Sequence, residues 1–265
     1  MLEIFQYDFM QRAFLAGIMI AVLASFSGSF LVLKRYSLMS ETLSHAALVG
    51  VALALLMDVY PLVMAVIISL FSAWLIEFLR SYYKIYSDSI LAIFLSGSLA
   101  LAVVIVSLAD AFNSSLFSYL FGSILAVSEN DIYAIMGFGS LSLVILFVYY
   151  KEFYFIAFDE EVAQVSGINV KALNFLFISV VAIIIALSIK IVGSLLIGAL
   201  MVMPTVSALR YRLGFVQTTM LSVVFAVVSV ILGLILSYLF SLPSGATIVL
   251  VVLSFFLISL LINRR

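Results

Sequence analysis

The chain has 265 residues, of which 66% are hydrophobic and only 9% are charged, with a formal net charge of -1. A soluble domain carries about 25% charged residues, so this composition predicts an integral, multi-pass protein of the cell membrane and excludes a nucleic-acid-binding face. The sequence has no cysteine and one histidine, His45, which excludes disulfides, thiolate metal sites and sites that need several histidines from one chain.

Apolar runs long enough to cross a bilayer recur along the whole chain. A hydrocarbon core about 30 Å thick requires about 20 helical residues. Runs of this length predict nine transmembrane helices, near residues 9–33, 38–57, 61–79, 89–108, 131–150, 171–190, 192–209, 216–240 and 245–262. The expected fold is therefore an all-α, polytopic helical bundle. It forms a single transmembrane domain over residues 1–265, which leaves no room for a separate soluble domain.

Basic residues gather in the loops on one side of this nine-span plan. They are Lys34, Arg35, Arg80, Lys84, Lys151, Lys171, Arg210, Arg212, Arg264 and Arg265. Because cytoplasmic loops carry an excess of Lys and Arg, we expect the N-terminus outside and the C-terminus in the cytoplasm. Glu77 is expected to pair with Arg80, three residues later. The opposite loops contain Asp58, the one basic exception Lys190, and an acidic rim that we expect to be solvated: Asp110, Glu129 and Asp131.

The second expected span contains two ionisable side chains, Glu41 and His45. They are four residues apart, so they share one face of a helix. They lie roughly one to three turns into the membrane from the cytoplasmic side, where an ionisable group indicates function. A carboxylate and an imidazole are half of a site for a divalent metal such as Zn²⁺ or Mn²⁺. The alternative is that the two side chains hydrogen-bond to each other or to nearby backbone.

Small residues form a ridge on the same span. Ala46, Gly50 and Ala54 recur every four residues, one position around the helix from the Glu41/His45 face. This spacing lets two helices approach closely. A two-fold axis beside this helix would bring two Glu41/His45 pairs together and supply four ligands. Ordinary packing within one chain is the alternative explanation of the ridge.

Two later segments are not simple spans. Residues 111–128 are apolar but interrupted by Ser, Asn and Gly, which predicts a short re-entrant or interfacial piece on the outer side. Residues 151–170 form the one substantial cytoplasmic loop. Within it, Asp159 is expected to cap a short helix, and Gly167 to end it. Such a short helix is marginal in water, so we expect it to rest on a partner protein or on the bundle itself.

Together these features resemble the membrane-spanning permease of ABC-type zinc/manganese uptake transporters. The resemblance covers the whole chain and depends most on residues 37–46, which read SLMSETLSHA. Residues 119–123, residues 158–161 with Gly167, and residues 192–204 support it. Glu161, Ala163 and Gly167 also fit the short E-x-A-x-x-x-G pattern by which many ABC permeases present a coupling helix to their ATPase.

This resemblance implies a homodimer of permeases over two copies of an ATP-binding subunit, supplied by an extracellular or periplasmic metal-binding protein. It implies that Glu41 and His45 are the metal ligands on the pathway, and that no cofactor is permanently bound. The residues that couple the permease to its ATPase would be Asp159, Glu160, Glu161, Ala163 and Gly167. The family usually has Asp where this chain has Glu41. Residues 39–45, which read MSETLSH, are more similar to zinc-type members than to manganese-type ones, which more often have Gly before the acid. Zinc is therefore the predicted cargo, with manganese or iron as the alternative.

Other functions make different demands on the sequence. The chain has no P-loop, so we expect a transport subunit rather than an enzyme, with ATP hydrolysis on a separate polypeptide. A secondary transporter or channel would show inverted repeats, and none is evident. An intramembrane enzyme would need more than one histidine and one nearby glutamate. A permease for cobalamin or an iron chelate would not need a Glu/His pair.

Overall fold

The computed structural model describes residues 7–83, 85–108, 114–123 and 127–262, and the regular structure in these ranges is entirely helical. The twelve helices are α1 (Asp8–Leu33), α2 (Ser37–Met57), α3 (Pro61–Tyr83), α4 (Ser87–Leu108), α5 (Ser114–Phe121), α6 (Glu129–Val148), α7 (Tyr150–Phe158), α8 (Glu160–Val165), α9 (Val170–Ser188), α10 (Ile197–Leu209), α11 (Phe215–Phe240) and α12 (Ser244–Ile262). Eight of them are long and apolar enough to cross a membrane. The all-α polytopic bundle predicted from composition is confirmed.

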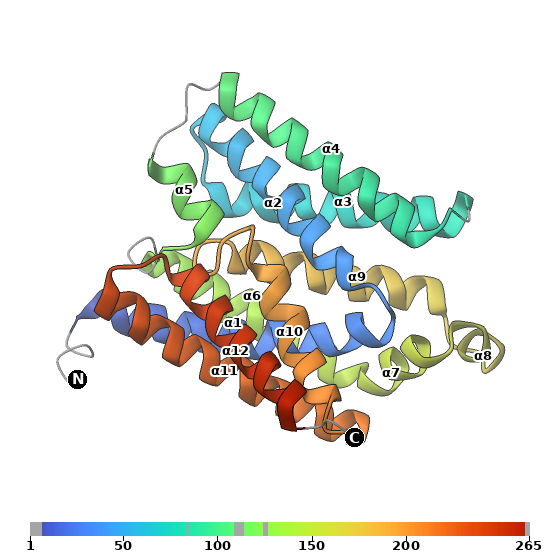
Figure 1. The fold of residues 1–265 in the computed structure, drawn as a ribbon. Helices are drawn as coiled ribbons and strands as arrows, with labels where there is room; N and C mark the ends of the chain where they lie inside the picture. Colours follow the sequence, from blue (N-terminus) through green and yellow to red (C-terminus); the bar gives the residue numbers. More distant parts are fainter. Residues whose placement is uncertain (1–6, 84, 109–113, 124–126, 263–265) are drawn as a thin grey trace.

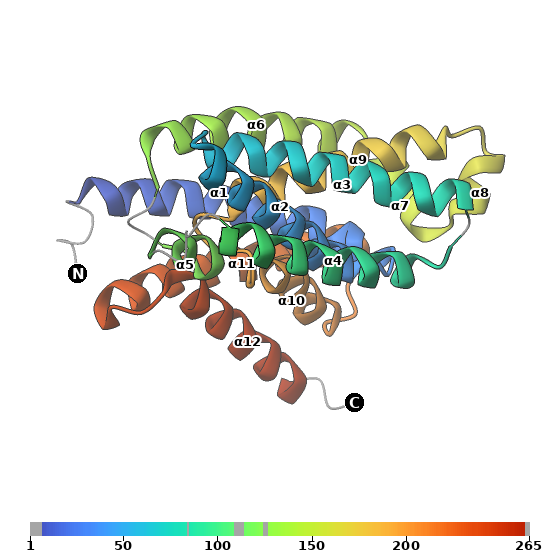
Figure 2. The same cartoon turned by 90° about the horizontal axis from the view of Figure 1, so that it is seen from above.

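The helices run back and forth between the two ends of the bundle (Figure 1). α2 packs against α3 and α4 in one part, while α1 packs against α6, α10 and α11 in the other. α9 contacts α3, α6 and α2, so it joins the two parts. Seen from above, α12 lies on the side of the bundle opposite α6, and it contacts α10 and α11 (Figure 2). Helices α1, α2 and α9 are mostly buried within the chain, whereas α4, α6, α11 and α12 are mostly exposed on its surface.

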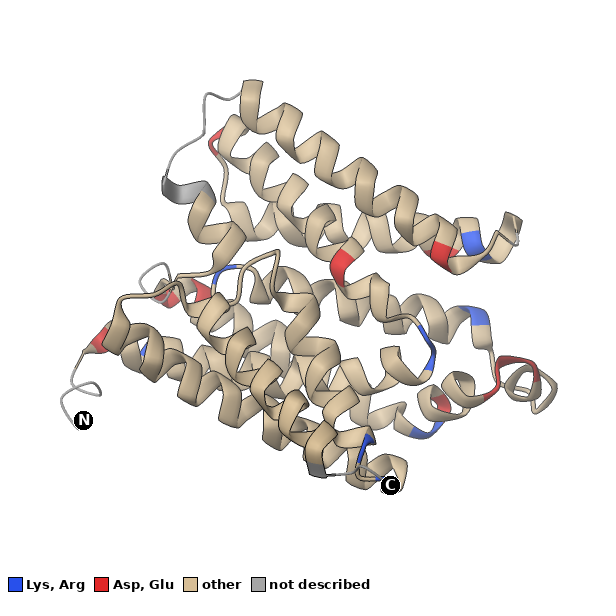
Figure 3. Ribbon diagram, viewed as in Figure 1, with Lys and Arg blue, Asp and Glu red and all other residues tan. Residues whose placement is uncertain are grey.

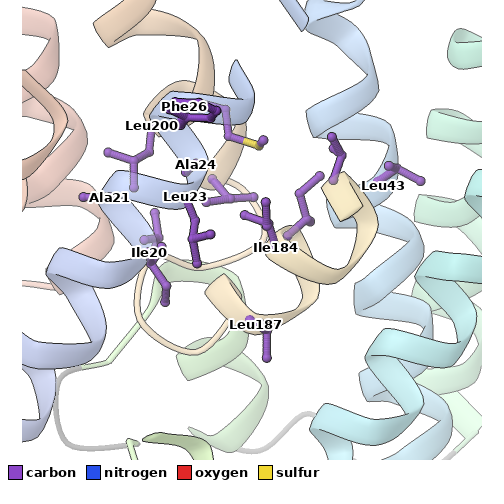
Figure 4. Packing of buried hydrophobic residues seen from close by; sticks show 14 of the residues in the cluster. Ile20, Ala21, Leu23, Ala24, Phe26, Leu43, Ile184, Leu187 and Leu200 are labelled. Atoms are coloured by element: carbon purple, nitrogen blue, oxygen red, sulfur yellow. The ribbon is translucent and has the colours of Figure 1, made fainter. Parts of the chain in front are cut away.

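The core forms where α1, α2, α9 and α10 meet. Figure 4 shows Ile20, Leu23, Leu43, Ile184 and Leu200 from these four helices in one cluster of buried side chains. α1 and α10 come into backbone contact at Gly28, because a Cβ built there would lie 2.0 Å from the Met201 carbonyl oxygen. The centre of the bundle is thus tightly packed, with α10 held directly against α1.

The seventh expected span, near residues 192–209, is not one continuous helix. Residues 189–196 form turns, and the following α10 has only 13 residues. A helix of that length is about 20 Å long, shorter than a bilayer core of about 30 Å. Gly193 has a φ of +89°, a left-handed conformation that ends the helical path. The nine-span plan therefore becomes eight long helices and one short one.

Most of the charged residues lie at the two ends of the bundle (Figure 3). The end where α1, α3 and α10 finish and where α7 and α9 begin contains the basic residues Lys34, Arg35, Arg80, Lys151, Lys171, Arg210 and Arg212. The other end contains Arg12 and Lys190 among the described residues. This asymmetry follows the loops that the sequence identified as basic.

Candidate functional site

α2 carries both predicted metal ligands, one helical turn apart. Glu41 is exposed, whereas the His45 side chain is buried, with 5% of its surface accessible. The first turn of α10 passes close to Glu41, because a Cβ built on Gly198 would lie 3.6 Å from the Glu41 Cβ. The pair therefore lies where α2 faces the short helix α10.

His45 and Ser194 each have a buried polar atom without a hydrogen-bond partner in the part of the chain that the structure describes. These atoms are His45 Nδ1 and the Ser194 hydroxyl. Most buried polar side-chain atoms in folded proteins have a partner, so an unpaired one indicates a missing ligand, ion or water. The Ser44 hydroxyl donates to the Ser194 carbonyl oxygen at 2.7 Å, so the two unpaired groups belong to elements in direct contact.

The 189–196 segment is held in place by backbone pairing with residues 119–123. Ser194 N–H donates to the Tyr119 carbonyl at 2.8 Å, and Ser123 N–H donates to the Lys190 carbonyl at 3.0 Å. Non-helical backbone at membrane depth is tolerated only where it is buried in protein or lines a cavity. Interrupted helices of this kind form the substrate sites of many transporters. Ser194 was not identified as a site residue from the sequence, because its position depends on this long-range pairing.

The expectation that Asp131 belongs to a solvated rim is wrong. Its side chain is buried, with 2% of the residue accessible, and it forms an ion pair with Lys190 at 2.7 Å. The Tyr60 hydroxyl donates to the other carboxylate oxygen, and burial raises the pKa of Tyr60, so that hydroxyl stays protonated. The lone basic residue predicted on this side therefore ties the 189–196 segment to α6. Glu129 is exposed and pairs with Arg12 at 2.7 Å, and Asp110 lies outside the described residues.

The small-residue ridge of α2 is buried within the single chain. Ala46 and Ala54 have at most 1% of their surface accessible. A Cβ built on Gly50 would lie 2.5 Å from the Met64 carbonyl oxygen of α3, so glycine here permits close packing of α2 on α3. The ridge is not available to a second copy. We therefore place no dimer contact on it, and a meeting of two copies has to use another face.

The loop residues predicted to couple to an ATPase form α8 and its two ends. The Asp159 side chain caps the helix by accepting from the N–H groups of Glu161 and Val162 at 3.1 and 3.0 Å. Ala163 is fully buried against the bundle, whereas Glu161 is exposed. Gly167 ends the segment with a φ of +87° and has open space around it. The short helix therefore rests on the bundle, which was one of the two expected supports, and it still has an exposed face.

A cluster of charges attaches α8 to the bundle. Arg80 forms ion pairs with Glu77 and with Glu160, the latter at 3.2 Å, which confirms the expected Glu77–Arg80 pair. Asn174 donates to Glu160 at 2.7 Å and accepts from Lys34. Burial would raise the pKa of Glu160, but the hydrogen bonds and charge of Arg80 outweigh it and keep that pKa below its usual value. Burial lowers the pKa of Lys34 to about 8.

The described residues contain no group of three or more His, Cys, Asp or Glu side chains that could hold a metal ion. A structural metal site normally has four protein ligands, and a catalytic one has three. Glu41 and His45 are therefore too few to retain an ion tightly within one chain.

A model of the ABC 3 transport family matches residues 6–263. The chain belongs to this family. It is 37% identical over 240 residues to a Treponema pallidum protein named "Probable metal transport system membrane protein", covering 91% of this chain and 90% of that one. It is 31% identical to the manganese transport system membrane protein MntC of Listeria innocua, covering 97% of this chain and 91% of the relative. Family membership and the eight apolar helices make it a multi-pass permease of the plasma membrane.

A solved structure shares both the fold and the sequence. The chain is similar to a chain of the PsaBC complex of Streptococcus pneumoniae bound to a Fab, with a TM-score of 0.86 and 31% identity. The match covers 97% of this chain and 93% of the other. As an ABC 3 family permease, the chain is a membrane subunit of a metal importer rather than a catalytic subunit. The resemblance to metal-uptake permeases seen in the sequence is confirmed at this level, whereas the preference for zinc is not supported by these names.

Proposed function

We propose that the chain is the permease of an ATP-driven importer of divalent manganese, and that the ion passes between Glu41 and His45. The observation that carries this proposal is the buried, unpartnered Nδ1 of His45 on a helix that faces an interrupted one. Carboxylate oxygen suits Mn²⁺, and imidazole accepts several first-row metals including Zn²⁺. The relatives named for manganese transport favour manganese over zinc.

The proposed site is completed by a second copy of the chain. One chain supplies two ligands, and a two-fold axis beside the exposed Glu41 would bring four together. Four ligands from two copies bind an ion only while the copies are close. Such a site can therefore hold the ion in one state of the transporter and release it in another.

The proposed partners bind at opposite ends of the bundle. An ATP-binding subunit docks on the exposed face of α8, at the end rich in Lys and Arg, which is cytoplasmic by the positive-inside rule. A metal-binding protein delivers the ion at the other end. Because the chain has no cysteine, Asp58→Cys and Glu161→Cys can be labelled singly with a membrane-impermeant thiol reagent. In intact cells only Asp58→Cys should react. Labelling of Glu161→Cys would show that the chain has the opposite orientation in the membrane.

The decisive experiment measures ATP-driven manganese and zinc uptake into proteoliposomes that contain the permease and its ATPase. We expect His45→Ala to abolish uptake and Glu41→Asp to retain much of it, because the usual family residue at that position is Asp. Glu129→Gln, which changes an exposed acid 66% accessible at its side chain, is the matched control and should transport normally. Near-normal uptake by His45→Ala would show that Glu41 and His45 have a structural role and do not bind the ion. Uptake of zinc with no competition by manganese would favour the zinc alternative.

A further inference from the structure

A groove opens on the flank of the bundle between α1, α6, α7 and α11. Its volume is about 770 Å³, within the range of about 300–1,000 Å³ typical of small-molecule sites. It lies where α6 ends and α11 begins, which places it at the basic end of the bundle. At that depth the acyl chains of a bilayer meet their headgroups. Neither Glu41, nor His45, nor any residue of α8 lines the groove, and the transport proposal does not use it.

Most of the groove wall is apolar and faces outward. Its aliphatic and Phe side chains come from α1, α6 and α11: Val22, Phe26, Phe147, Val148, Val216, Met220 and Val223. Phe147 and Met220 are 62% and 65% exposed, although a soluble protein would bury such side chains. In a membrane these side chains face lipid. This wall suits an acyl chain lying along the helices.

The cytoplasmic end of the same groove is polar. Tyr150, Lys151 and Glu152 line it, at the start of α7. The Tyr150 hydroxyl and Glu152 Oε2 are both buried and have no hydrogen-bond partner among the described residues. Burial raises the pKa of Tyr150, so its hydroxyl remains a donor. A buried carboxylate oxygen without a donor is costly, which indicates that something absent from the chain itself donates to it.

We propose that this groove binds a phospholipid with a primary-amine headgroup, as in phosphatidylethanolamine, from the cytoplasmic leaflet. The acyl chain lies along the apolar wall. The headgroup ammonium donates to Glu152, while Lys151 and the Tyr150 hydroxyl donate to the phosphate. One zwitterion thus supplies a cation to the unpaired Oε2 of Glu152 and an anion to the neighbouring donors.

Charge complementarity distinguishes this lipid from other common ones. The choline group of phosphatidylcholine has no N–H and cannot donate to Glu152 Oε2. The glycerol group of phosphatidylglycerol carries no positive charge, so it leaves the buried carboxylate without a counter-ion. A hydrogen bond between charged partners is roughly twice as strong as a neutral one, which corresponds here to about a tenfold preference.

The test is retention of lipid by the purified full-length chain, measured by native mass spectrometry. Detergent micelles receive dioleoyl phosphatidylethanolamine, phosphatidylcholine or phosphatidylglycerol, so that only the headgroup differs. We expect about tenfold stronger retention of phosphatidylethanolamine than of the other two. Glu152→Gln should remove this preference, and Lys151→Ala should weaken retention of all three. Lys171→Ala changes a lysine outside the groove and should retain phosphatidylethanolamine like the unmodified chain.

Two further variants keep the proposal testable if Glu152→Gln does not fold. Met220→Trp fills the exposed wall without touching the core, and it should reduce retention of every phospholipid. Met220→Cys provides the one cysteine of the chain and reports whether two copies meet at this groove. Equal retention of the three lipids, or an equal effect of Lys171→Ala, would overturn the proposal. Efficient disulfide formation by Met220→Cys would assign the groove to a second copy of the chain instead.

Discussion

Gly245 is where the smallest change in the chain should have a large effect. A Cβ built there would lie 1.8 Å from the Val192 carbonyl oxygen and 2.5 Å from the Phe121 carbonyl oxygen. Both obstacles are backbone atoms, so no side-chain rotation relieves the clash. In Gly245→Ala the 189–196 segment has to retreat until the shorter contact reaches at least 3.0 Å. Overpacking of this kind costs about 1–3 kcal/mol, against less than about 1 kcal/mol gained from helix propensity.

We therefore expect Gly245→Ala to lower the free energy of unfolding by about 1–2 kcal/mol. It should also reduce metal uptake, because the 189–196 segment places Ser194 against Ser44, next to His45. The assays are thermal unfolding in detergent and uptake into proteoliposomes. Gly97→Ala is the matched control, since a Cβ on Gly97 meets nothing within 4 Å. If Gly245→Ala unfolds and transports like Gly97→Ala, the segment is not held by this contact and the reasoning is refuted.

Three other predictions concern the end of the bundle that is rich in Lys and Arg. Proline cannot adopt the φ of +87° at position 167, and Gly167→Pro loses the N–H that donates to the Gln164 carbonyl at 3.1 Å. The distortion is local to the end of α8, so ATP hydrolysis should lose its coupling to transport while the helical bundle stays folded, as circular dichroism would show. Arg80→Met leaves Glu77 buried without its ion-pair partner, so the free energy of unfolding from thermal denaturation should fall by about 3–5 kcal/mol. The double variant, with Arg80→Met and Glu77→Met together, should recover most of this loss. Burial lowers the pKa of Lys34 from 10.5 to about 8, so between these pH values the unfolded chain binds more protons than the folded one. The free energy of unfolding should therefore rise with pH over this range, and Lys34→Met should abolish the rise. A free energy of unfolding that does not change with pH would contradict this.

Most of the bundle could be predicted from the sequence because each long helix carries its own apolar run. α1 and α11 begin and end within a residue or two of the spans read from hydropathy. The break before α10 could not be predicted to its full extent. It depends on hydrogen bonds between residues 119–123 and 190–195, which are about 70 residues apart in sequence, rather than on any local property except Gly193.

The candidate site could be predicted only where a residue stands out from its local sequence. His45 is the one histidine of the chain and Glu41 lies one helical turn before it, so both stand out in an apolar span. Ser194 is one of many serines, and only the fold places it beside Ser44. Asp131 and Lys190 were interpreted separately, because nothing in the sequence indicates that two residues 59 positions apart form an ion pair.

The Ser44 hydroxyl has one proton but lies near two acceptors, the Ser194 carbonyl oxygen at 2.7 Å and the Glu41 carbonyl oxygen of its own helix at 2.8 Å. If α2 and the 189–196 segment separate, the proton stays with the helix and no buried donor is left unpaired. Breaking this contact therefore leaves the Ser194 carbonyl oxygen as the one member of the pair that loses its partner, so the penalty of about 1–3 kcal/mol for an unpaired buried group applies once rather than twice. The contact between α2 and the 189–196 segment, beside the proposed metal ligands, can therefore break and re-form without leaving the Ser44 hydroxyl unpaired.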